Sequence, residues 1–447
     1  MKLLAVVRHP DSVQRWCLAL ALVNALPGCF EPPCEAASEP GGPFVPCAAP
    51  GDAGRSDAGA TDAGRADAGA GDAGRADAGR ADAGLDAGRA DAGRDGGLLP
   101  TSDAGVRVID FGTLVLGDAG LSRELSFLVE PADEGFQVQV VGLGPSLDTY
   151  QVNRIFSPSG TVVAMGPDYR RHLSWSRPDV NVANAVVLES DDARREWVPG
   201  LWRFSVESRR PVATTAVAVK VFVKPRPPPG PQRLAINLLF TGSAGLTAAT
   251  APAQPRLTTA MNVFRDIFAD AGITLDAPRY FDLPPGFSAI TSTWEDAGSP
   301  PMGRSLEALL RQSSLAPAGM NLFFVETLIL DPQLPPGFIL GVAGGVPGAT
   351  MTNGTGASGV AILFDSPRYV PAMGEDDPLG LVLAHEVAHQ LGLSHVFELT
   401  GLVDNLRDTP TSGVDAEKNL MAPTATGNGS LSPSQGVTLR RNPVVRP

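Results

Sequence analysis

The chain has 447 residues and a formal net charge of −13 at pH 7, with 35 Lys and Arg residues against 48 Asp and Glu residues. This length is enough for about two or three domains. The acidic balance argues against a nucleic-acid partner, since phosphate binding needs clustered cations, and it favours a soluble, charged surface. After the first thirty residues no apolar run reaches the length of a membrane span.

The first 29 residues are typical of a secretory signal. A basic start (Lys2, Arg8 and Arg15) precedes the run from Trp16 to Leu26, which is apolar but too short to span a membrane. The run ends in Leu26-Pro27-Gly28-Cys29, which resembles a bacterial lipobox, where the signal is cut before a cysteine that then carries the lipid. We therefore expect an exported protein, either a cell-envelope lipoprotein held at the membrane by Cys29 or an extracellular protein cleaved nearby. A cytoplasmic protein with an apolar first helix is the remaining alternative.

Residues 30–105 have the composition of a disordered linker. Asp-Ala-Gly occurs nine times between Asp52 and Gly93, often with Arg between the repeats, and almost no bulky side chain is available for burial. Such a segment cannot offset the entropy cost of ordering, so we expect a flexible tether rather than a solenoid or a calcium-binding array. Cys34 and Cys47 could form a disulfide in an oxidising compartment or remain free thiols.

Residues 106–224 show the period-two alternation of β-strands. The clearest segments, separated by Gly, Pro, Asp and Ser, are Leu125–Val129, Phe136–Val141, Trp202–Val206 and Ala216–Val223. About eight short strands without a helical period predict a β-sandwich. Pro199-Gly200-Leu201-Trp202-Arg203-Phe204 resembles the Pro-Gly-aromatic turn and strand of bacterial pre-peptidase-type jelly-roll domains. Substrate binding, attachment to a wall or glycan, and shielding of an active site are its open roles. The Pro-rich segment 225–231 predicts a stiff connector.

Residues 232–447 mix apolar strands with helical periodicity. Strands are expected at Leu234–Phe240, Ile273–Leu275, Asn321–Leu330 and Val360–Phe364, and helices at Leu257–Ala271, near Leu306–Leu310 and at Leu379–Leu391. This order predicts an α/β domain in which a twisted sheet is backed by two long helices. Leu383, Val387 and Leu391 form the expected apolar stripe of the last helix.

Residues His385 to His395 read HEVAHQLGLSH and contain three of the five histidines of the chain. On a helix, His385 and His389 project from one face, so both rings can reach one Zn²⁺ ion. Gly392 would end the helix and turn the chain, which brings His395 round as a third ligand. Glu386 points to a neighbouring sector, where its carboxylate would act as the general base on a zinc-activated water.

This pattern, H-E-x-x-H-x-x-G-x-x-H, resembles the signature of the metzincin metalloproteases. Over roughly residues 232–441 the chain is also similar to the pappalysin-like branch of that family, in the segments Asn321–Val325, Gly359–Leu363, Asp408-Thr409-Pro410, Asn419-Leu420-Met421 and Leu431–Gln435. The resemblance implies a zinc endopeptidase with Met421 in a methionine turn beneath the metal. Two features depart from it: Ala422 and Pro423 follow Met421 where many members carry Tyr, and the region has no cysteine.

Gly354–Gly359 spells G-x-G-x-x-G, the pattern of a dinucleotide-binding turn. Such a site needs a strand before the glycines and a helix after them, whereas here polar residues precede the segment and a strand follows it. We expect instead a mobile loop above the active site. The strand after it, Val360–Phe364, could pair with an extended substrate.

Asp404 and Asp408 lie in an oxygen-rich loop after the third histidine. Carboxylate oxygens in such a loop are ligands that Ca²⁺ prefers, so a structural Ca²⁺ site is an expectation here. The alternative is that these carboxylates only cap turns.

Together these features predict a secreted or lipid-anchored zinc metalloendopeptidase that acts on protein or peptide substrates. A dedicated peptide substrate outside proteins, such as a cell-wall stem, is one alternative. Another is a non-enzymatic surface lipoprotein that binds a partner through its β-sandwich and keeps an inactive or structural metal site. Glu386 favours the enzyme, since a structural site needs no base.

Overall fold

A computed structural model describes residues 101–447, apart from residues 104, 118, 145–147, 166–174, 178, 190–196, 209–214, 293–304, 331–338, 367–368, 370–377, 398–403, 405 and 424–428. The signal-like segment, Cys29 and nearly all of the expected linker therefore lie outside the described residues. Residues 97–447 belong to one compact unit, rich in strands and with few helices in its described part. No described helix is both long enough and apolar enough to cross a membrane.

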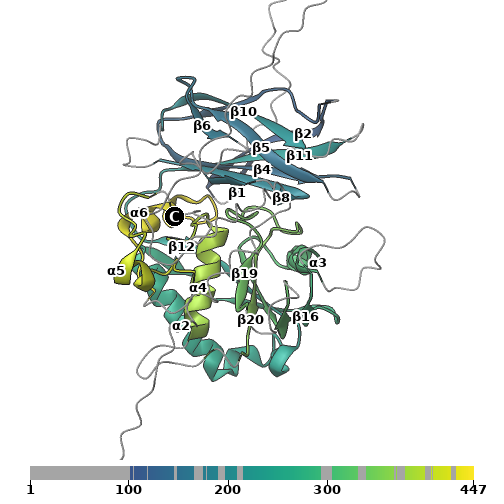
Figure 1. The fold of residues 1–447 in the computed structure, drawn as a ribbon, viewed down its shortest axis with the longest axis vertical. Helices are drawn as coiled ribbons and strands as arrows, with labels where there is room; N and C mark the ends of the chain where they lie inside the picture. The colour runs from purple at the N-terminus through teal and green to yellow at the C-terminus, as the bar shows by residue number, and fades with distance from the viewer. Residues whose placement is uncertain are drawn as a thin grey trace, which may run out of the picture. The chain divides into compact units, whose positions relative to one another are not determined.

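The first half of this unit consists of two antiparallel sheets (Figure 1). The six-stranded sheet has the order β1-β2-β11-β4-β9-β7, and the other has the order β3-β10-β5-β6 with β8 paired to β5. The strands are β1 Thr101–Asp103, β2 Val106–Val115, β3 Leu125–Val129, β4 Asp133–Gly142, β5 Thr149–Phe156, β6 Val162–Met165, β7 Trp175–Arg177, β8 Asp179–Val180, β9 Val182–Leu188, β10 Gly200–Ser208 and β11 Ala216–Pro225. This arrangement is consistent with the expected β-sandwich.

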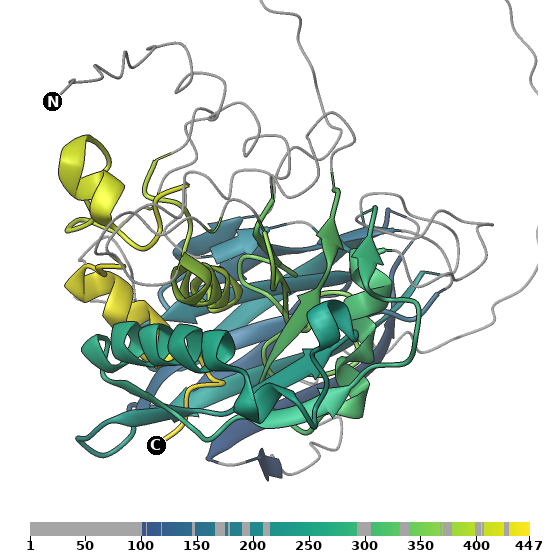
Figure 2. The ribbon, with the colours of Figure 1, turned by 90° about the horizontal axis from the view of Figure 1, so that it is seen from below.

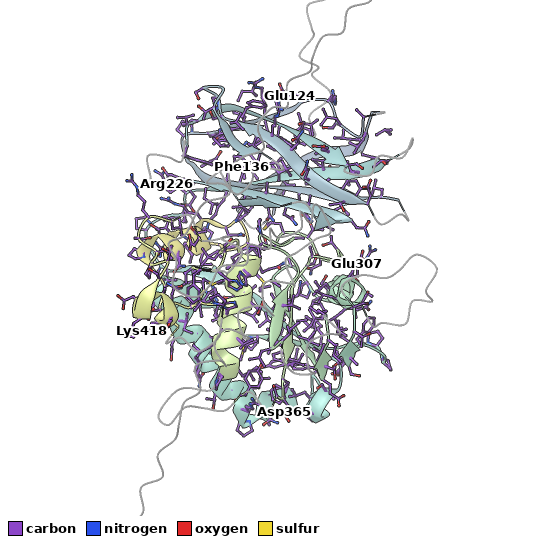
Figure 3. All side chains as sticks on the ribbon, in the orientation of Figure 1. Glu124, Phe136, Arg226, Glu307, Asp365 and Lys418 are labelled. Carbon is purple, nitrogen blue, oxygen red and sulfur yellow. The ribbon has the colours of Figure 1, made fainter. Side chains whose placement is uncertain are left out.

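Alternating apolar side chains of the two sheets share one core. Strand β3 buries every second residue and exposes those between, which is why the sequence of this half has period two. Aromatic rings fill the centre: the ring centroid of Phe136 lies 4.8 Å from that of Phe127 and 5.2 Å from that of Trp202, both edge to face (Figure 3). Rings in this geometry add to the free energy gained by burial.

The sheet extends beyond the limits expected for the sandwich. Strand β1, Thr101–Asp103, pairs with β2 although the linker was expected to run to residue 105, and β11 continues through Pro225, the first residue of the expected connector. Strands pair through backbone groups that every residue carries, so the polar side chains of Thr101–Asp103 do not indicate that this segment is a strand.

The second half is built around a mixed sheet of order β15-β13-β17-β20-β19. Strands β15 (Arg279–Asp282), β13 (Ile236–Phe240), β17 (Met320–Val325) and β20 (Val360–Leu363) run parallel, whereas β19 (Gly341–Ala343) is antiparallel to β20. Strands β13, β17 and β20 are buried along their whole length, as is usual for parallel strands covered on both faces. Two short parallel pairs lie outside this sheet: β12 (Gln232–Leu234) with β14 (Ile273–Leu275), and β16 (Ala289–Ile290) with β18 (Thr327–Leu328).

Two long helices, α2 (Pro255–Asp270) and α4 (Pro378–Gln390), pack against each other (Figure 2). Their backbones come close at Gly380, where a Cβ atom would lie 2.5 Å from Cβ of Val263. Apolar side chains of both helices join those of the mixed sheet in one core. The other described helices are α3 (Leu306–Arg311), α5 (Gly413–Lys418) and α6 (Pro433–Arg441), and 3-10 turns occur at Ser243–Gly245, Ala251–Ala253 and Gln312–Leu315.

The segment Gly354–Gly359 is packed against the second half, because Thr355, Ala357 and Ser358 are buried and the N–H of Gly354 donates to Oγ of Ser313 at 2.7 Å. The mobility expected for this loop stays a prediction, whereas the role expected for the strand after it is wrong. Strand β20 cannot pair with a substrate, because it already lies between β17 and β19. An apolar run indicates a buried strand, but it does not reveal which strand lies at the edge of the sheet.

Candidate metal centre

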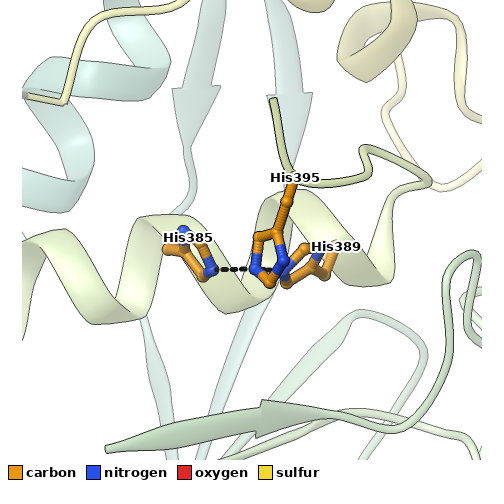
Figure 4. Close-up of side chains that lie close together, drawn as sticks. All are labelled: His385, His389 and His395. Carbon is orange, nitrogen blue, oxygen red and sulfur yellow. Dashed lines mark hydrogen bonds between the residues drawn. The ribbon is translucent and has the colours of Figure 1, made fainter. Parts of the chain in front are cut away.

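Helix α4 ends in a turn that brings three imidazole rings together (Figure 4). Gly392 has φ 114°, its N–H donates to the carbonyl of His389, and the N–H of Leu393 donates to the carbonyl of Ala388, each at 2.9 Å. This pair of bonds is the Schellman arrangement that ends a helix at a left-handed residue. The chain then doubles back, so that His395 faces His385 and His389, as the sequence predicts.

The three rings direct their Nε2 atoms to one point. Nε2 of His395 lies 3.0 Å from Nε2 of His389 and 3.2 Å from Nε2 of His385. Three nitrogens bound to one tetrahedral zinc at 2.0–2.1 Å would lie roughly 3.3–3.4 Å apart, so the observed spacing fits such an ion. The rings are buried, and in the described part of the chain they are the one group of this kind that could hold a metal ion.

Backbone carbonyls hold the opposite side of two of these rings. Nδ1 of His385 donates to the carbonyl of Leu420 at 2.7 Å, and Nδ1 of His389 donates to that of Leu393 at 2.6 Å. With protons on Nδ1, the lone pairs on Nε2 face the shared point, as metal ligands must. Burial lowers the pKa of His385 to about 4, which keeps this ring neutral. Lone pairs converging this closely repel one another unless a cation lies between them, so the donor set fits a metal.

Glu386 lies next to the histidines on α4 but is not a member of their ligand group. Burial raises the pKa of its carboxyl to about 8, while a hydrogen bond from the backbone N–H of Ala343 lowers it. A Cβ atom built on Gly341 would lie 2.6 Å from Cγ of Glu386. The side chain of Glu386 therefore rests directly on the backbone of β19.

Met421 is fully buried in a turn that contacts both segments carrying the histidines. Its carbonyl accepts from the N–H of Val396 at 2.9 Å, and its own N–H donates to Oδ1 of Asn419 at 2.9 Å. The preceding residue, Leu420, supplies the carbonyl that holds His385. The turn is thus part of the scaffold of the three rings.

A buried amide supports this turn from α6. Nε2 of Gln435 donates to Oδ2 of Asp404 at 3.0 Å and to Oδ1 of Asn419 at 3.2 Å, and its Oε1 accepts from Nδ2 of Asn419 and from the N–H of Ser432, both at 2.9 Å. The N–H of Asp404 in turn donates to the carbonyl of His395 at 2.8 Å. In the sequence, Gln435 is marked only by the resemblance of Leu431–Gln435 to the pappalysin-like branch. Ser432-x-x-Gln435 is, however, a capping box that can be found in the sequence.

The carboxylates expected to bind Ca²⁺ are engaged by donors of the protein. Asp408 accepts from Oγ of Ser432 at 3.0 Å and from the N–H of Ser434 at 2.9 Å. Asp404 accepts from the N–H of Leu406 at 2.8 Å, in addition to the bond from α6. These bonds use the oxygens that a Ca²⁺ ion needs, so the structure favours the alternative that both side chains cap turns.

Other supporting groups have no signature in the sequence. The carbonyls of Leu393 and Leu420 and the N–H of Ala343 belong to the backbone, so residue type does not mark them. Cys29, the residue expected to carry a lipid, lies outside the described residues, and its modification stays a prediction.

Searches with protein-family models and among curated proteins find no match to this chain. Among solved structures it is similar to metalloproteinase-II from Bacteroides fragilis, with 14% sequence identity and a TM-score of 0.28, over 48% of this chain and 54% of that one. It is also similar to a family two carbohydrate esterase from Clostridium thermocellum, with 12% identity and a TM-score of 0.14, over 52% of this chain and 66% of that one. A family two carbohydrate esterase from Cellvibrio japonicus matches with 13% identity and a TM-score of 0.16, over 49% and 67% of the two chains.

The chain spans about half the length of that metalloproteinase. TM-scores this low do not establish a shared fold, so the function proposed below rests on the geometry of the site.

Proposed function

We propose that this protein is a zinc-dependent endopeptidase of the metzincin type that hydrolyses protein or peptide substrates. The observation that carries the proposal is the convergence of three buried Nε2 atoms beside a carboxylate, Glu386, that is not part of the ligand group. Structural zinc sites are closed by four protein ligands, whereas catalytic sites keep one position open. The described residues offer three, which favours a catalytic site.

Zinc bound at the three Nε2 atoms would supply Lewis-acid chemistry, lowering the pKa of water toward neutral and polarising a carbonyl group. Glu386 accepts the proton of the attacking water and delivers it to the nitrogen of the leaving group. The backbone of β19 holds its carboxylate in place through the N–H of Ala343. The carbonyls of Leu393 and Leu420 keep two imidazoles in the tautomer that a metal needs.

Strand β19 offers a place for the substrate backbone. Among the described strands, β20 is its one neighbour, so no described strand pairs with the other edge of β19, where the N–H of Ala343 bonds to Glu386. An extended peptide that adds to this edge would pass Gly341 and Ala343, the two residues against Glu386. Cleavage within an extended segment of the substrate is what this geometry favours.

Glu386→Gln tests the proposal, because glutamine keeps the shape of the side chain but cannot accept the proton. We expect Glu386→Gln to retain one zinc ion per chain and to cleave unfolded protein and a peptide library about 10²-fold to 10⁴-fold more slowly than the wild type. Glu417→Gln, at an exposed position on α5, is the control and should cleave at the wild-type rate. Equal rates for wild type and Glu386→Gln would leave only a binding or structural role for the site.

We also propose that the chain is exported and attached to the membrane through Cys29, on the strength of its first 29 residues. Cys29→Ser should abolish incorporation of a labelled fatty acid and move the protein from the membrane fraction to the soluble fraction. Cys34→Ser is the matched control and should behave like the wild type. Labelling of Cys29→Ser at the wild-type level would show that another residue carries the lipid, or that the label does not report this modification.

A further inference from the structure

The two halves of the compact unit meet through buried polar side chains. On β4, Phe136 and Val138 face the core of the sandwich, whereas Gln137 and Gln139 lie on the opposite face of the sheet. Both glutamines are nevertheless almost fully buried, with exposed fractions of 0% and 2%. Residues 348–352 of the second half cover them, as the following hydrogen bonds establish.

Each glutamine bonds to the second half. Nε2 of Gln137 donates to the carbonyl of Gly348 at 2.8 Å, and Oγ1 of Thr350 donates to Oε1 of Gln137, also at 2.8 Å. Oγ1 of Thr352 donates to Oε1 of Gln139 at 2.9 Å. Further along the same junction, Nδ2 of Asn181 donates to Oε1 of Glu307 at 2.9 Å; Figure 3 labels Glu307 on α3.

The segment that receives Gln137 also contacts the last turn of α4. The N–H of Gly348 donates to the carbonyl of Gln390 at 3.0 Å, and Nε2 of Gln390 donates to the carbonyl of Ala357 at 2.7 Å. Gly348 and Gln390 are in direct contact, because a Cβ atom on Gly348 would lie 2.0 Å from Nε2 of Gln390. Helix α4 and strand β4 therefore both form hydrogen bonds to the backbone of Gly348, α4 to its N–H and β4 to its carbonyl.

A second route runs through Thr350. Its Oγ1, which bonds to Gln137, lies 3.3 Å from Oδ1 of Asn442. Nδ2 of Asn442 donates to the carbonyl of Leu391 at 3.0 Å. Among the described residues the hydroxyl of Thr352 bonds to Gln139, whereas its carbonyl accepts from Oγ of Ser358 at 2.6 Å, a bond that Thr352→Val keeps. The two threonines thus make similar bonds to the sandwich, but the bonds of Thr350 continue to the end of the zinc-motif helix.

Gln390 and Leu391, which these bonds hold, lie between His389 and the turn that leads to His395. Gln390 follows His389 directly, and Leu391 precedes Gly392. We propose that Gln137 is a positioning residue for the metal centre, which makes the β-sandwich a working part of the zinc site rather than a separate shield or docking module. This inference goes beyond the proposed function, because it concerns metal affinity and does not require peptide cleavage.

The first test compares Thr350→Val with Thr352→Val in the full chain. Each substitution keeps the shape of the side chain and removes one hydroxyl bond to the sandwich. We expect Thr350→Val to weaken zinc affinity about tenfold, the lower end of the range for groups that support metal ligands, and Thr352→Val to change it by less than about twofold. Zinc affinity is measured by competition with a chromophoric chelator, at a temperature at which circular dichroism shows both variants folded.

Equal zinc affinities for the two variants would overturn the proposal, whether both are weakened or both are unchanged. If both affinities are weakened, loss of any hydrogen bond between the two halves lowers zinc affinity. If both are unchanged, these hydrogen bonds do not affect the zinc site. A wild-type chain that binds no zinc would overturn this proposal together with the metal centre. A wild type that binds zinc but cleaves no peptide would remove the peptidase function and leave this comparison intact.

A second pair keeps the test decisive if Thr350→Val fails to fold. Gln137→Leu is compared with Gln151→Leu, since Gln151 is also fully buried in the sandwich but donates to Glu207 within the other sheet, at 2.6 Å. We expect the zinc dissociation rate of Gln137→Leu to rise about tenfold and that of Gln151→Leu to stay within about twofold of the wild type. The same dissociation rate in both glutamine variants would contradict the proposal.

Discussion

The position of Glu386 depends on a residue of another element that has no side chain. The backbone at Gly341 on β19 lies so close to Glu386 that any Cβ atom would overlap its Cγ. A general base must be held to within a fraction of an ångström to take a proton efficiently. In the mechanism proposed above, the glycine at position 341 therefore helps to position the general base, although it carries no reactive group.

Gly341→Ala should separate catalysis from metal binding. The new methyl group pushes Glu386 away from β19, so we expect the rate of peptide cleavage to fall about tenfold to a hundredfold while the zinc content stays at one ion per chain. Gly142→Ala creates a similar overlap, 2.5 Å from the ring of Tyr150 in the sandwich, and should leave the rate unchanged. The ratio of rate to zinc content is the measurement. A wild-type ratio in Gly341→Ala would show that Glu386 has room to move without loss.

The histidines could be predicted from the sequence because their chemistry fixes their spacing. Four residues along a helix and a glycine turn are enough to bring His385, His389 and His395 together, without knowledge of the rest of the fold. The contact of the Glu386 side chain with the backbone of β19 could not be predicted in this way. It depends on β19, more than forty residues earlier in the chain, and only the folded sheet brings Gly341 beneath the helix.

At the scale of elements, the end of α4 decides whether His395 reaches His385 and His389. Gly392 adopts a backbone conformation that residues with a side chain rarely take, and the two hydrogen bonds of the helix end depend on it. The strain introduced by a side chain there would be relieved by moving the turn, and His395 moves with the turn.

Gly392→Ala should therefore weaken zinc binding more than it weakens the fold. We expect zinc affinity to fall by more than about tenfold, and the free energy of unfolding of the metal-free chain to fall by about 1–2 kcal/mol. Gly413→Ala provides the comparison, because Gly413 also has a positive φ, 80°, and lies in open space. It should cost similar stability and leave zinc affinity intact. Chelator competition and denaturant unfolding measure the two quantities, and equal zinc affinities in the two variants would contradict the prediction.

Most elements of the second half could be predicted from periodicity. The helix expected at Leu257–Ala271 is α2, the helix expected at Leu379–Leu391 is α4 with its apolar stripe buried, and the strand expected at Val360–Phe364 is β20. The pairing of these strands could not be predicted, because side-chain pattern reveals burial but not neighbours. This is why β20 was assigned the edge position that β19 occupies.

At the scale of the whole molecule, a buried ion pair ties the strand before the proline-rich segment to the chain beyond it. Nζ of Lys224, at the end of β11, lies 3.2 Å from Oε1 of Glu134 and donates to Oε1 of Gln232 at 2.5 Å and to the carbonyl of Arg440. Lys224 is 1% exposed. Lys224 and Gln232, the residues on either side of the stiff connector expected at residues 225–231, are therefore joined by a buried hydrogen bond.

Burial is the main cause that lowers the pKa of Lys224 to about 8; Glu134 opposes this shift, and Arg441 and Arg440 add to it. Below pH 8 the amine carries its proton in both the folded and the unfolded chain, and the cost of burying the charge is fully present. Between pH 8 and the ordinary value of 10.5 the unfolded chain holds a proton that the folded chain has released, so this residue makes stability rise with pH.

Lys224→Met removes this titration. The stability of the wild type relative to Lys224→Met should increase from pH 8 to pH 10, by an amount on the order of 2 kcal/mol. Lys220→Met removes an exposed lysine of the same strand that pairs with Asp110, and the wild type should show no such trend relative to it. Denaturant unfolding at several pH values measures the differences. A flat difference between wild type and Lys224→Met over this range would mean that Lys224 keeps its ordinary pKa.

The hydrogen bonds of Gln435 have a consequence for the order in which the protein matures. A chain emerging during synthesis already carries every metal-binding ring once residue 395 has appeared, and its methionine turn once residue 421 has. It still lacks the amide that joins Asn419 to Asp404, and also Asn442, which secures the helix end. A growing polypeptide therefore bears the three rings before the side chains of α6 and Asn442 that support their turns. For the peptidase proposed above, we expect activity to appear only after α6 has docked.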